Sequence, residues 1–350
     1  MRKKRVIKVG NVFIGGDYPV SVQTMTKFRT SEIGSVLKQI KKIEQTGGEI
    51  VRLSVLDKND AESIAHIKKN TKLPLVADIH YDWKLAIDTM ESGVDKIRIN
   101  PSNIQKSGLI NIIKEAKKKN IPIRLGLNSG SIRITPRGLV KDIVDAAIGA
   151  IKLCEDLDFF DIVISLKTPG VVETIECYRA IHEMYDYPLH LGVTEAGLGD
   201  TGLVKNALGI GILLSEGIGN TIRISLTDSP EKEVKVGQAI LQALGLRKFY
   251  PEIISCPICG RCQVPLKKIL LTFKNRIMRM LKKYPELKNF TIAIMGCSVN
   301  GPGEAKQADI GIAGGKDRFA LFARGSIIGT YSTEEIEEAF FNQLKEMLHG

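Results

Sequence analysis

The sequence predicts a TIM-type (β/α)8 barrel followed by a small α/β domain, and three observations indicate this arrangement. After Pro19, a short run rich in β-branched residues, a polar or glycine-containing turn and a helix-length amphipathic segment follow one another eight times. Polar side chains recur at the ends of the predicted strands. The repeat stops after Leu244, which leaves about a hundred residues for a second domain.

The chain opens with two short runs, residues 6–9 and 12–14, on either side of Gly10-Asn11. This residue pair suits the positive φ angles of a tight hairpin turn. We therefore expect a hairpin that plugs one end of the barrel.

Eight strands and eight helices follow in strict alternation. The strands are expected at residues 20–25, 50–54, 75–79, 96–99, 123–127, 161–165, 189–192 and 221–225. The helices are expected near residues 31–46, 59–70, 83–91, 107–120, 136–157, 171–185, 201–217 and 229–244. Eight such units in about 250 residues are typical of a closed parallel barrel with its active site at the carboxyl ends of the strands. A doubly wound open sheet is the alternative architecture.

Basic, acidic and amide side chains occupy the ends of those strands; three of the four pairs are two residues apart, and the fourth pair, Arg124 with Asn128, begins and ends its strand. These side chains are Arg52, Asp78 with His80, Arg98 with Asn100, Arg124 with Asn128, Lys167, and Arg223 with Ser225. A spacing of two places both members of a pair on one face of a strand. Five cations would then converge on the mouth of the barrel.

These cations could instead point outward and pair with acids on the surrounding helices. Five at matching positions argue against that, because cations packed together repel unless an anion binds between them. We therefore predict a phosphate-bearing substrate, with two phosphates gripped by arginine forks. The net charge of +11 has a plainer source, a lysine-rich solvated surface such as residues 114–119.

Two glycine-rich turns, residues 195–202 and 217–220, could offer backbone N–H groups to phosphate or could be tight connections. Within the first turn, Glu195 is a candidate proton donor at the mouth. A salt bridge to one of the arginines is the alternative role for it.

The domain boundaries are expected at residues 1–245 for the barrel, 246–252 for a linker and 253–350 for the second domain. The second domain should contain a basic helix near residues 264–283 and a closing helix from residue 333. Its strands are expected near residues 291–295, 309–313, 318–323 and 326–329.

A group of cysteines in this second domain indicates a metal centre. Cys256, Cys259 and Cys262 form C-x-x-C-x-x-C, the spacing that begins bacterial ferredoxin motifs. With Cys297 they could supply four thiolates; Cys256, Cys259, Cys297 and Glu304 form an alternative set. Zinc and a redox dithiol also fit a lone C-x-x-C. The remaining two, Cys154 and Cys177, lie on barrel helices and should be buried apolar residues.

The chain resembles the 4-hydroxy-3-methylbut-2-enyl diphosphate synthase family, in its bacterial two-domain form, along nearly its whole length. The resemblance is carried by residues 77–80 (ADIH), 97–101 (IRINP), 125–130 (LGLNSG), 191–197 (LGVTEAG), 255–261 (SCPICGR) and 295–304 (MGCSVNGPGE). The chain departs from the family at Ser102, where glycine is common, which affects only the local turn.

The resemblance implies a [4Fe–4S] cluster held by Cys256, Cys259, Cys297 and Glu304, with Cys262 as a neighbour. It also implies reductive ring opening of 2-C-methyl-D-erythritol 2,4-cyclodiphosphate, with uptake of two electrons and loss of one oxygen as water. A replaceable carboxylate such as Glu304, unlike a fourth thiolate, would leave one iron able to act as a Lewis acid. Glu195 or His80 would then manage a proton.

Several expectations concern location and partners. No apolar run reaches the roughly 20 residues of a membrane span, and the basic start lacks a following apolar run, so a cytoplasmic protein is expected. An acidic flavodoxin or ferredoxin would suit the basic surface as electron donor. A head-to-tail homodimer is expected because the last barrel helix returns to the end opposite the mouth; the resemblance implies the same arrangement.

A different class of protein would be a zinc-knuckle protein whose basic surface binds RNA. It leaves the inward cations unexplained, and the chain has few aromatic residues for base stacking. We therefore expect no nucleic-acid partner. A phosphate-binding barrel with a purely structural cluster is a third interpretation.

Overall fold

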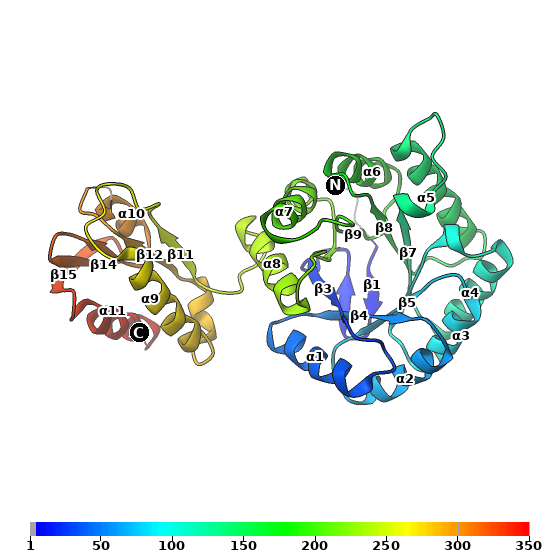
Figure 1. Cartoon of the computed structure of the whole chain (residues 1–350), viewed down its shortest axis with the longest axis horizontal. Helices are drawn as coiled ribbons and strands as arrows, with labels where there is room; N and C mark the ends of the chain where they lie inside the picture. Colours follow the sequence, from blue (N-terminus) through cyan, green and yellow to red (C-terminus); the bar gives the residue numbers. More distant parts are fainter. Residues whose placement is uncertain (1–4, 300, 350) are drawn as a thin grey trace. The chain divides into compact units, whose positions relative to one another are not determined.

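The computed structural model describes residues 5–299 and 301–349. The chain divides into two compact units, Met1–Arg247 and Lys248–Gly350 (Figure 1). Each unit is described by itself below.

The first unit opens with the expected hairpin, formed by β1 (Ile7–Val9) and β2 (Val12–Ile14). Gly10 in the turn has a φ of 57°, a left-handed conformation that glycine adopts without strain. The apolar side chains of the hairpin form one buried cluster with Ile50, Val76 and Val163 of the barrel strands. These residues lie at or near the amino ends of their strands, so the hairpin plugs the end of the barrel opposite the mouth.

An eight-stranded parallel barrel follows, with the strand order β8-β7-β6-β5-β4-β3-β10-β9. The strands are β3 (Ser21–Met25), β4 (Ile50–Val55), β5 (Leu75–Ile79), β6 (Lys96–Ile99), β7 (Ile123–Asn128), β8 (Ile162–Lys167), β9 (His190–Leu191) and β10 (Thr221–Ile222). An isolated parallel bridge between Ile164 and Leu189 joins β8 to β9 and closes the ring. The predicted barrel is thus confirmed, and the open sheet is excluded.

Within the described part of this unit, eight helices are present, and Figure 1 shows that helices surround the strands. They are α1 (Ile33–Gln45), α2 (Lys58–Lys69), α3 (Trp83–Glu91), α4 (Lys106–Lys119), α5 (Leu139–Glu155), α6 (Val171–Met184), α7 (Gly199–Ser215) and α8 (Pro230–Ala243). Helix α5 begins three residues later than predicted because Asp142 caps the preceding loop, accepting hydrogen bonds from the backbone N–H and hydroxyl of Thr135.

The last two barrel strands are shorter than predicted, since residues 223–225 and 192 lie outside the regular ladder. The side chain of Asn206 replaces the ladder at Ser225: its Oδ1 accepts from the Ser225 N–H at 3.1 Å and its Nδ2 donates to the Ser225 carbonyl at 3.0 Å. A polar helix side chain therefore satisfies the backbone where the strand would otherwise continue.

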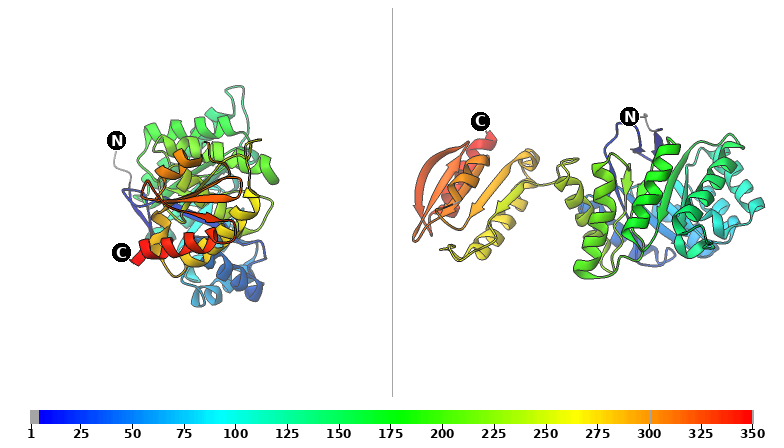
Figure 2. Two further views of the ribbon diagram at one scale, coloured as in Figure 1. Left: turned by 90° about the vertical axis from the view of Figure 1, so that its left-hand side faces the viewer. Right: turned by 90° about the horizontal axis from the view of Figure 1, so that it is seen from above.

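The second unit contains a five-stranded sheet in the order β11-β12-β13-β14-β15 (Figure 2). Its elements are β11 (Glu252–Ser255), α9 (Leu266–Leu281), β12 (Thr291–Met295), α10 (Gly301–Gln307), β13 (Ile310–Gly314), β14 (Arg318–Ala323), β15 (Ser326–Ser332) and α11 (Ile336–His349). Strands β11, β12 and β13 are parallel, whereas β13, β14 and β15 are antiparallel.

Our sequence analysis missed β11 and α10. Strand β11 is only four residues long, and its first residue, Glu252, falls in the linker expected at residues 246–252. Helix α10 begins Gly-Pro-Gly, a run with poor helix propensity. It forms because Ala305 and Ala308 pack against Ala293, Met295 and Phe322 of the sheet, so tertiary contacts override the local preference.

Helices cover both faces of this sheet. Ile292 and Ile294 pack in one cluster with residues of α9 and α11, including Phe273 and Phe340. Ala293 and Met295, which alternate with them along β12, face α10. Among the described residues, we find no helix with both the length and the apolar character that a membrane span requires.

Candidate active site

The register of the barrel strands sets three of the predicted site residues side by side. Asp78 on β5 is paired with Arg98 on β6, and Arg98 is paired in turn with Arg124 on β7. All three are at least nine-tenths buried. Because side chains alternate between the two faces of a strand, residues paired in this way point into the barrel together.

Arg98 is held by four acceptors. Its Nη1 donates to Asp78 Oδ1 at 2.9 Å and to His80 Nε2 at 2.8 Å, while its Nη2 donates to Asn128 Oδ1 and to the Gly126 carbonyl, both at 3.0 Å. An arginine with both terminal nitrogens engaged has little donor capacity left. We therefore interpret Arg98 as a residue that organises the site.

Gly126 has no side chain, and this leaves room for the side chain of Arg98 to pass over β7. A Cβ atom at this position would clash with Nε of Arg98. Gly192 has a similar relation to Lys167, because a Cβ there would lie 2.5 Å from Lys167 Nζ and 2.6 Å from the Arg223 carbonyl. Gly126 on β7 and Gly192, directly after β9, thus leave room for two cations in the barrel mouth.

Two of the other cations each lie near a carboxylate. Arg52 lies 3.7 Å from Asp78, and Arg223 lies 3.6 Å from Glu233, measured between the charged atoms. The Glu233 carboxylate also has two other partners, since Thr24 Oγ1 and Lys27 Nζ donate hydrogen bonds to it at 2.7 and 2.9 Å. In the described part of the chain, Asp78 and Glu233 pair with three of the five predicted cations, Arg52, Arg98 and Arg223, and Arg124 and Lys167 form no ion pair there.

Arg124 is the most deeply buried of the five, with 1% of its surface exposed. Its Nη1 donates to Gln23 Oε1 at 3.1 Å, but its Nε and Nη2 have no partner among the described residues. Nε of Arg223 is in the same situation. Buried donors without acceptors are expensive, so these atoms mark where an anionic ligand would bind.

The pKa shifts of the charged residues at the mouth reflect its excess of positive over negative groups. Burial, together with the cations Arg223, Arg124, Arg52 and Arg98, lowers the pKa of Lys167 well below its ordinary value. Burial lowers the pKa of Arg52 to about 10, although Asp78 opposes the shift. Burial alone would raise the pKa of Asp78, but Arg52, Arg98 and His80 hold it well below its ordinary value.

The remaining predicted residues lie at the same end of the barrel, but their hydrogen bonds and exposure differ. Asn100 is buried and orients loops, since its Nδ2 donates to Ser131 Oγ and its Oδ1 accepts from the Ser102 N–H. Ser225 is fixed through its backbone, as described above. Glu195 follows β9, is exposed and has a φ of 51°. It forms no ion pair with any described residue, so the alternative of a salt bridge to an arginine is not seen.

Sequence reasoning missed several polar residues inside the barrel. Glu233 lies on the buried face of α8 and is 1% exposed; a carboxylate on the apolar stripe of an amphipathic helix could have revealed it. Gln23 and Lys96 occupy strand positions that alternate with apolar ones, the same spacing of two that revealed Arg98. His190 is also buried inside the barrel, but the sequence around it shows no comparable pattern.

The second unit brings the cysteines to one edge of its sheet. Cys256 follows β11 directly and Cys297 follows β12 by two residues, and these parallel neighbours end together, with Ser255 paired to Ile294. The backbone and side chain of Arg261 hydrogen-bond Cys259 and lower the pKa of its thiol. As expected, Cys154 and Cys177 are buried in the barrel, where burial raises the pKa of each thiol to about 12.

This edge fits a cluster of soft thiolate ligands. A Cβ at Gly296 would lie 2.5 Å from Cys262 Sγ and 3.6 Å from Cys256 Sγ, so a glycine here allows these two sulfurs to lie close to the backbone. The described residues contain no group of three ligands arranged for a single metal ion. A four-iron cluster takes one protein ligand per iron and spaces its thiolates farther apart. The side chain of Glu304 lies outside the described part of the structure.

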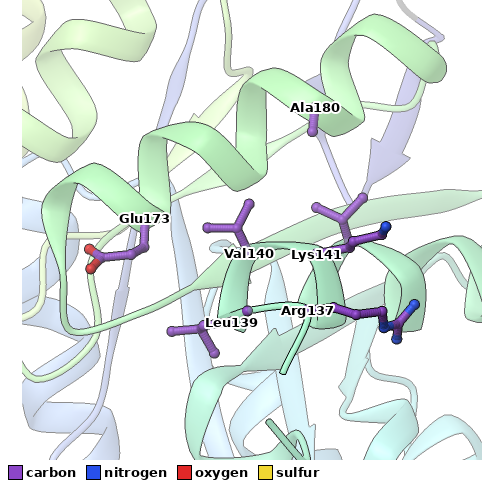
Figure 3. A pocket seen from close by; sticks show the side chains of 8 residues that line it. Arg137, Leu139, Val140, Lys141, Glu173 and Ala180 are labelled. Carbon is purple, nitrogen blue, oxygen red and sulfur yellow. The ribbon is translucent and has the colours of Figure 1, made fainter. Parts of the chain in front are cut away.

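A surface pocket of about 590 Å³ lies outside the barrel mouth, between α5 and α6 (Figure 3). Leu139, Val140 and Ala180 give it an apolar lining, and Arg137, Lys141 and Glu173 also line it. None of the strand-end residues takes part in this lining, so we assign no role in the chemistry to it.

The fold and these two sites define a class of protein: a (β/α)8 barrel whose mouth is lined by buried cations, joined to an α/β domain with four cysteines in the loops that follow its first two strands. Residues 4–238 match the GcpE TIM-barrel domain and residues 252–346 match the GcpE protein C-terminal domain. The chain belongs to the GcpE family.

Curated relatives match almost the whole chain. A protein of Ruminiclostridium cellulolyticum is 48% identical over 351 residues, covering 97% of each chain, and one of Caldanaerobacter subterraneus subsp. tengcongensis is 45% identical, covering 99% of this chain and 98% of its own. Both are named 4-hydroxy-3-methylbut-2-en-1-yl diphosphate synthase (flavodoxin).

Solved structures support the barrel fold alone. The dihydropteroate synthase of Yersinia pestis has a TM-score of 0.51 at 13% identity, covering 69% of this chain and 98% of that one. The enzyme of Coxiella burnetii has a TM-score of 0.51 at 12% identity, covering 70% and 99%.

Proposed function

We propose that the protein is an oxidoreductase that converts 2-C-methyl-D-erythritol 2,4-cyclodiphosphate to 4-hydroxy-3-methylbut-2-en-1-yl diphosphate. The reaction consumes two electrons and two protons, opens the ring and releases one oxygen as water. The observation that carries the proposal is the barrel mouth, where five cations face two carboxylates and buried guanidinium N–H groups lack acceptors. The full-length relatives carry the name of this activity.

The residues of the mouth have different roles in binding the diphosphate. Arg124 and Arg223 present donors that have no acceptor among the described residues, so they are the groups that phosphate oxygens would satisfy. Lys167 and Arg52 add positive charge beside them. Arg98 is saturated by Asp78, His80, Asn128 and Gly126, so it shapes the floor of the site and keeps the neighbouring cations apart.

The hydrogen bonds also distinguish the two candidates for proton transfer. Because the Arg98 guanidinium can only donate, His80 accepts with Nε2 and carries its proton on Nδ1. Its Nε2 is thereby committed to Arg98. Glu195 stands exposed at the mouth without an ion pair to a described residue, so we assign the proton to Glu195.

We propose that Cys256, Cys259, Cys297 and Glu304 hold a [4Fe–4S] cluster. When bound, such a cluster supplies electrons one at a time and, through an iron with an exchangeable ligand, Lewis acidity. The thiols fit this role because they emerge at one sheet edge beside Gly296. Cys262 instead donates from its thiol to the Val264 carbonyl at 3.3 Å, a local turn contact.

The proposal includes a flavodoxin as electron donor, a cytoplasmic setting that keeps thiols reduced, and a head-to-tail homodimer. Topology supports the dimer: α8 runs back from the mouth, so the chain leaves the barrel from the end opposite the anion-binding residues. Sedimentation of the anaerobically purified protein tests whether it is a dimer. A monomer that keeps full activity when diluted would contradict it.

The activity itself is tested with anaerobically purified, cluster-loaded protein, reduced methyl viologen and the cyclic diphosphate, with the product detected by ³¹P NMR. We expect conversion of the cyclic to the linear diphosphate, at two electrons per product. Binding of the cyclic diphosphate without any reduction would instead favour a phosphate-binding barrel with a structural cluster.

A further inference from the structure

The segment that follows the cysteines carries charge of one sign. Residues 253–285 contain eight lysines and arginines and no aspartate or glutamate. Seven of the eight lie on or directly after α9, and six of these are exposed: Lys267, Lys268, Lys274, Arg279, Lys282 and Lys283. Arg276 is the exception on this helix, since it is half-buried, pairs with Glu337 at 2.9 Å and stacks over Phe341.

Helix α9 has one side that is buried in the domain and another that is exposed. It buries Leu266, Phe273 and Ile277 against the sheet and α11. Away from this buried side, positions 267, 271, 274, 278 and 282 form one exposed stripe at helical spacing. We call this stripe the α9 face; its residues are Lys267, Leu271, Lys274, Met278 and Lys282.

The composition of the α9 face differs from that of an ordinary solvated helix. Leu271 is 57% exposed and Met278 is 38% exposed, so apolar side chains stand between the lysines. None of the lysines in the face forms an ion pair within the described part of the chain. On the lysine-rich helix α4, by contrast, Lys118 and Lys119 both lie near Glu115.

The α9 face begins beside the thiols. Leu266, the first residue of the helix, lies close enough to Gly296 that a Cβ there would be 3.2 Å from its Cδ2, and the same Cβ would meet the sulfurs of Cys256 and Cys262. A protein bound at Lys267 and Leu271 would therefore lie within about one helical turn of the two loops that carry Cys256 and Cys297.

We propose that the α9 face is the docking surface for an acidic, flavin-bearing electron carrier of the flavodoxin class. The inference rests on the proposed function and identifies where its reductant binds. Lysines around a small apolar patch suit a weak, transient electron-transfer contact, because charge steers the encounter and a small apolar area permits rapid release. The relatives' name specifies the carrier, and charge complementarity specifies the surface.

The test compares two doubly charge-reversed proteins, both cluster-loaded and handled without air. Lys267→Glu with Lys274→Glu changes the α9 face; Lys114→Glu with Lys118→Glu makes the same charge change on α4 of the barrel. Turnover of the cyclic diphosphate is measured with reduced flavodoxin at low salt and, separately, with reduced methyl viologen, a small donor that needs no protein docking surface.

We expect the α9 variant to raise the apparent KM for flavodoxin at least about tenfold and to flatten its salt dependence. Its viologen-driven rate should stay within about twofold of wild type, and the α4 variant should match wild type with both donors. An α9 variant with the wild-type KM for flavodoxin would overturn the docking surface while leaving the activity intact. Absence of viologen-driven turnover in wild type would instead defeat the proposed function.

Nucleic acid is the other polyanion that the lysines could attract. Binding of a fluorescent single-stranded RNA is therefore measured with the same proteins. If the α9 variant loses RNA binding but keeps its flavodoxin kinetics, the surface binds RNA and the inference is wrong.

Discussion

Arg98 and Asp78 form a buried ion pair across β5 and β6, with Nη1 of the arginine 2.9 Å from Oδ1 of the carboxylate. Asp78 also lies 3.7 Å from Arg52. One carboxylate therefore compensates two of the five cations, and the stability of the unliganded mouth depends on it.

Asp78→Asn should destabilise the barrel by about 3–5 kcal/mol, the usual consequence of removing one partner from a buried ion pair. Urea unfolding followed by the fluorescence of Trp83, the single tryptophan, reports on this unit. The control is Asp158→Asn, which removes only an exposed pair with Lys117 and should change stability by less than about 1 kcal/mol. A similarly small loss in Asp78→Asn would contradict the role of the pair.

The pH dependence of the Asp78 contribution follows from its lowered pKa. A carboxylate with a lower pKa in the folded state stabilises fully above its unfolded pKa of about 4, and the contribution disappears as pH falls through the folded pKa. The stability difference between wild type and Asp78→Asn should thus be constant from pH 5 to 8 and shrink only in stronger acid. A difference that changes steadily between pH 5 and 8 would point to another group.

Arg124→Met should separate stability from binding. Removing an incompletely partnered buried charge offsets the loss of the Gln23 hydrogen bond, so the unfolding free energy should stay within about 1 kcal/mol of wild type. Affinity for the cyclic diphosphate, measured by calorimetry without reductant, should fall about 10- to 100-fold. The exposed Arg137→Met serves as control, and unchanged affinity in Arg124→Met would remove Arg124 from the binding site.

Gly126→Ala should disturb Arg98, since the added Cβ would clash with its Nε and the guanidinium is fixed by its acceptors. We expect a loss of about 1–3 kcal/mol in stability and weaker binding of the cyclic diphosphate. Gly149→Ala, in α5 with no atom within 4 Å of the new Cβ, should be stabilising by about 0.5–1 kcal/mol. Equal stability changes in the two variants would show that Arg98 does not need this glycine.

Binding of the cyclic diphosphate should take up protons. Its phosphates carry only strongly acidic groups, whereas burial and neighbouring cations lower the pKa of Lys167 in the free protein. A bound dianion raises that pKa, so affinity should be highest below the free-state pKa and decline as pH rises above it. Calorimetry in two buffers of different ionisation enthalpy measures the uptake, which Lys167→Met should abolish. Equal uptake in that variant would assign it to another residue.

The barrel could be predicted because its information is local and repeated. Each strand is a short apolar run before an amphipathic helix, and inward positions such as Arg98 and Asn100 follow the period of two. Glu233 could not be found in this way, because its partners Thr24 and Lys27 are about 200 residues distant in sequence. Likewise, α10 forms on contacts with the sheet and against the preference of its Gly-Pro-Gly start.

The sequence indicated that Cys256, Cys259, Cys262 and Cys297 belong to one site but left the ligand set open. The structure adds that β11 and β12 deliver Cys256 and Cys297 to the same edge, and that the sulfurs of Cys256 and Cys262 both lie near Gly296. Spacing along the chain could not reveal this, since β11 escaped prediction altogether.

Iron and sulfide analysis of anaerobically purified protein, with the visible spectrum, tests the central proposal most directly when Cys262→Ala and Cys297→Ala are compared. We predict about four irons per chain and absorption near 400 nm in wild type and Cys262→Ala, and loss of both in Cys297→Ala. Zinc in place of iron, or loss of the cluster in Cys262→Ala, would contradict the ligand set and the reductase mechanism built on it.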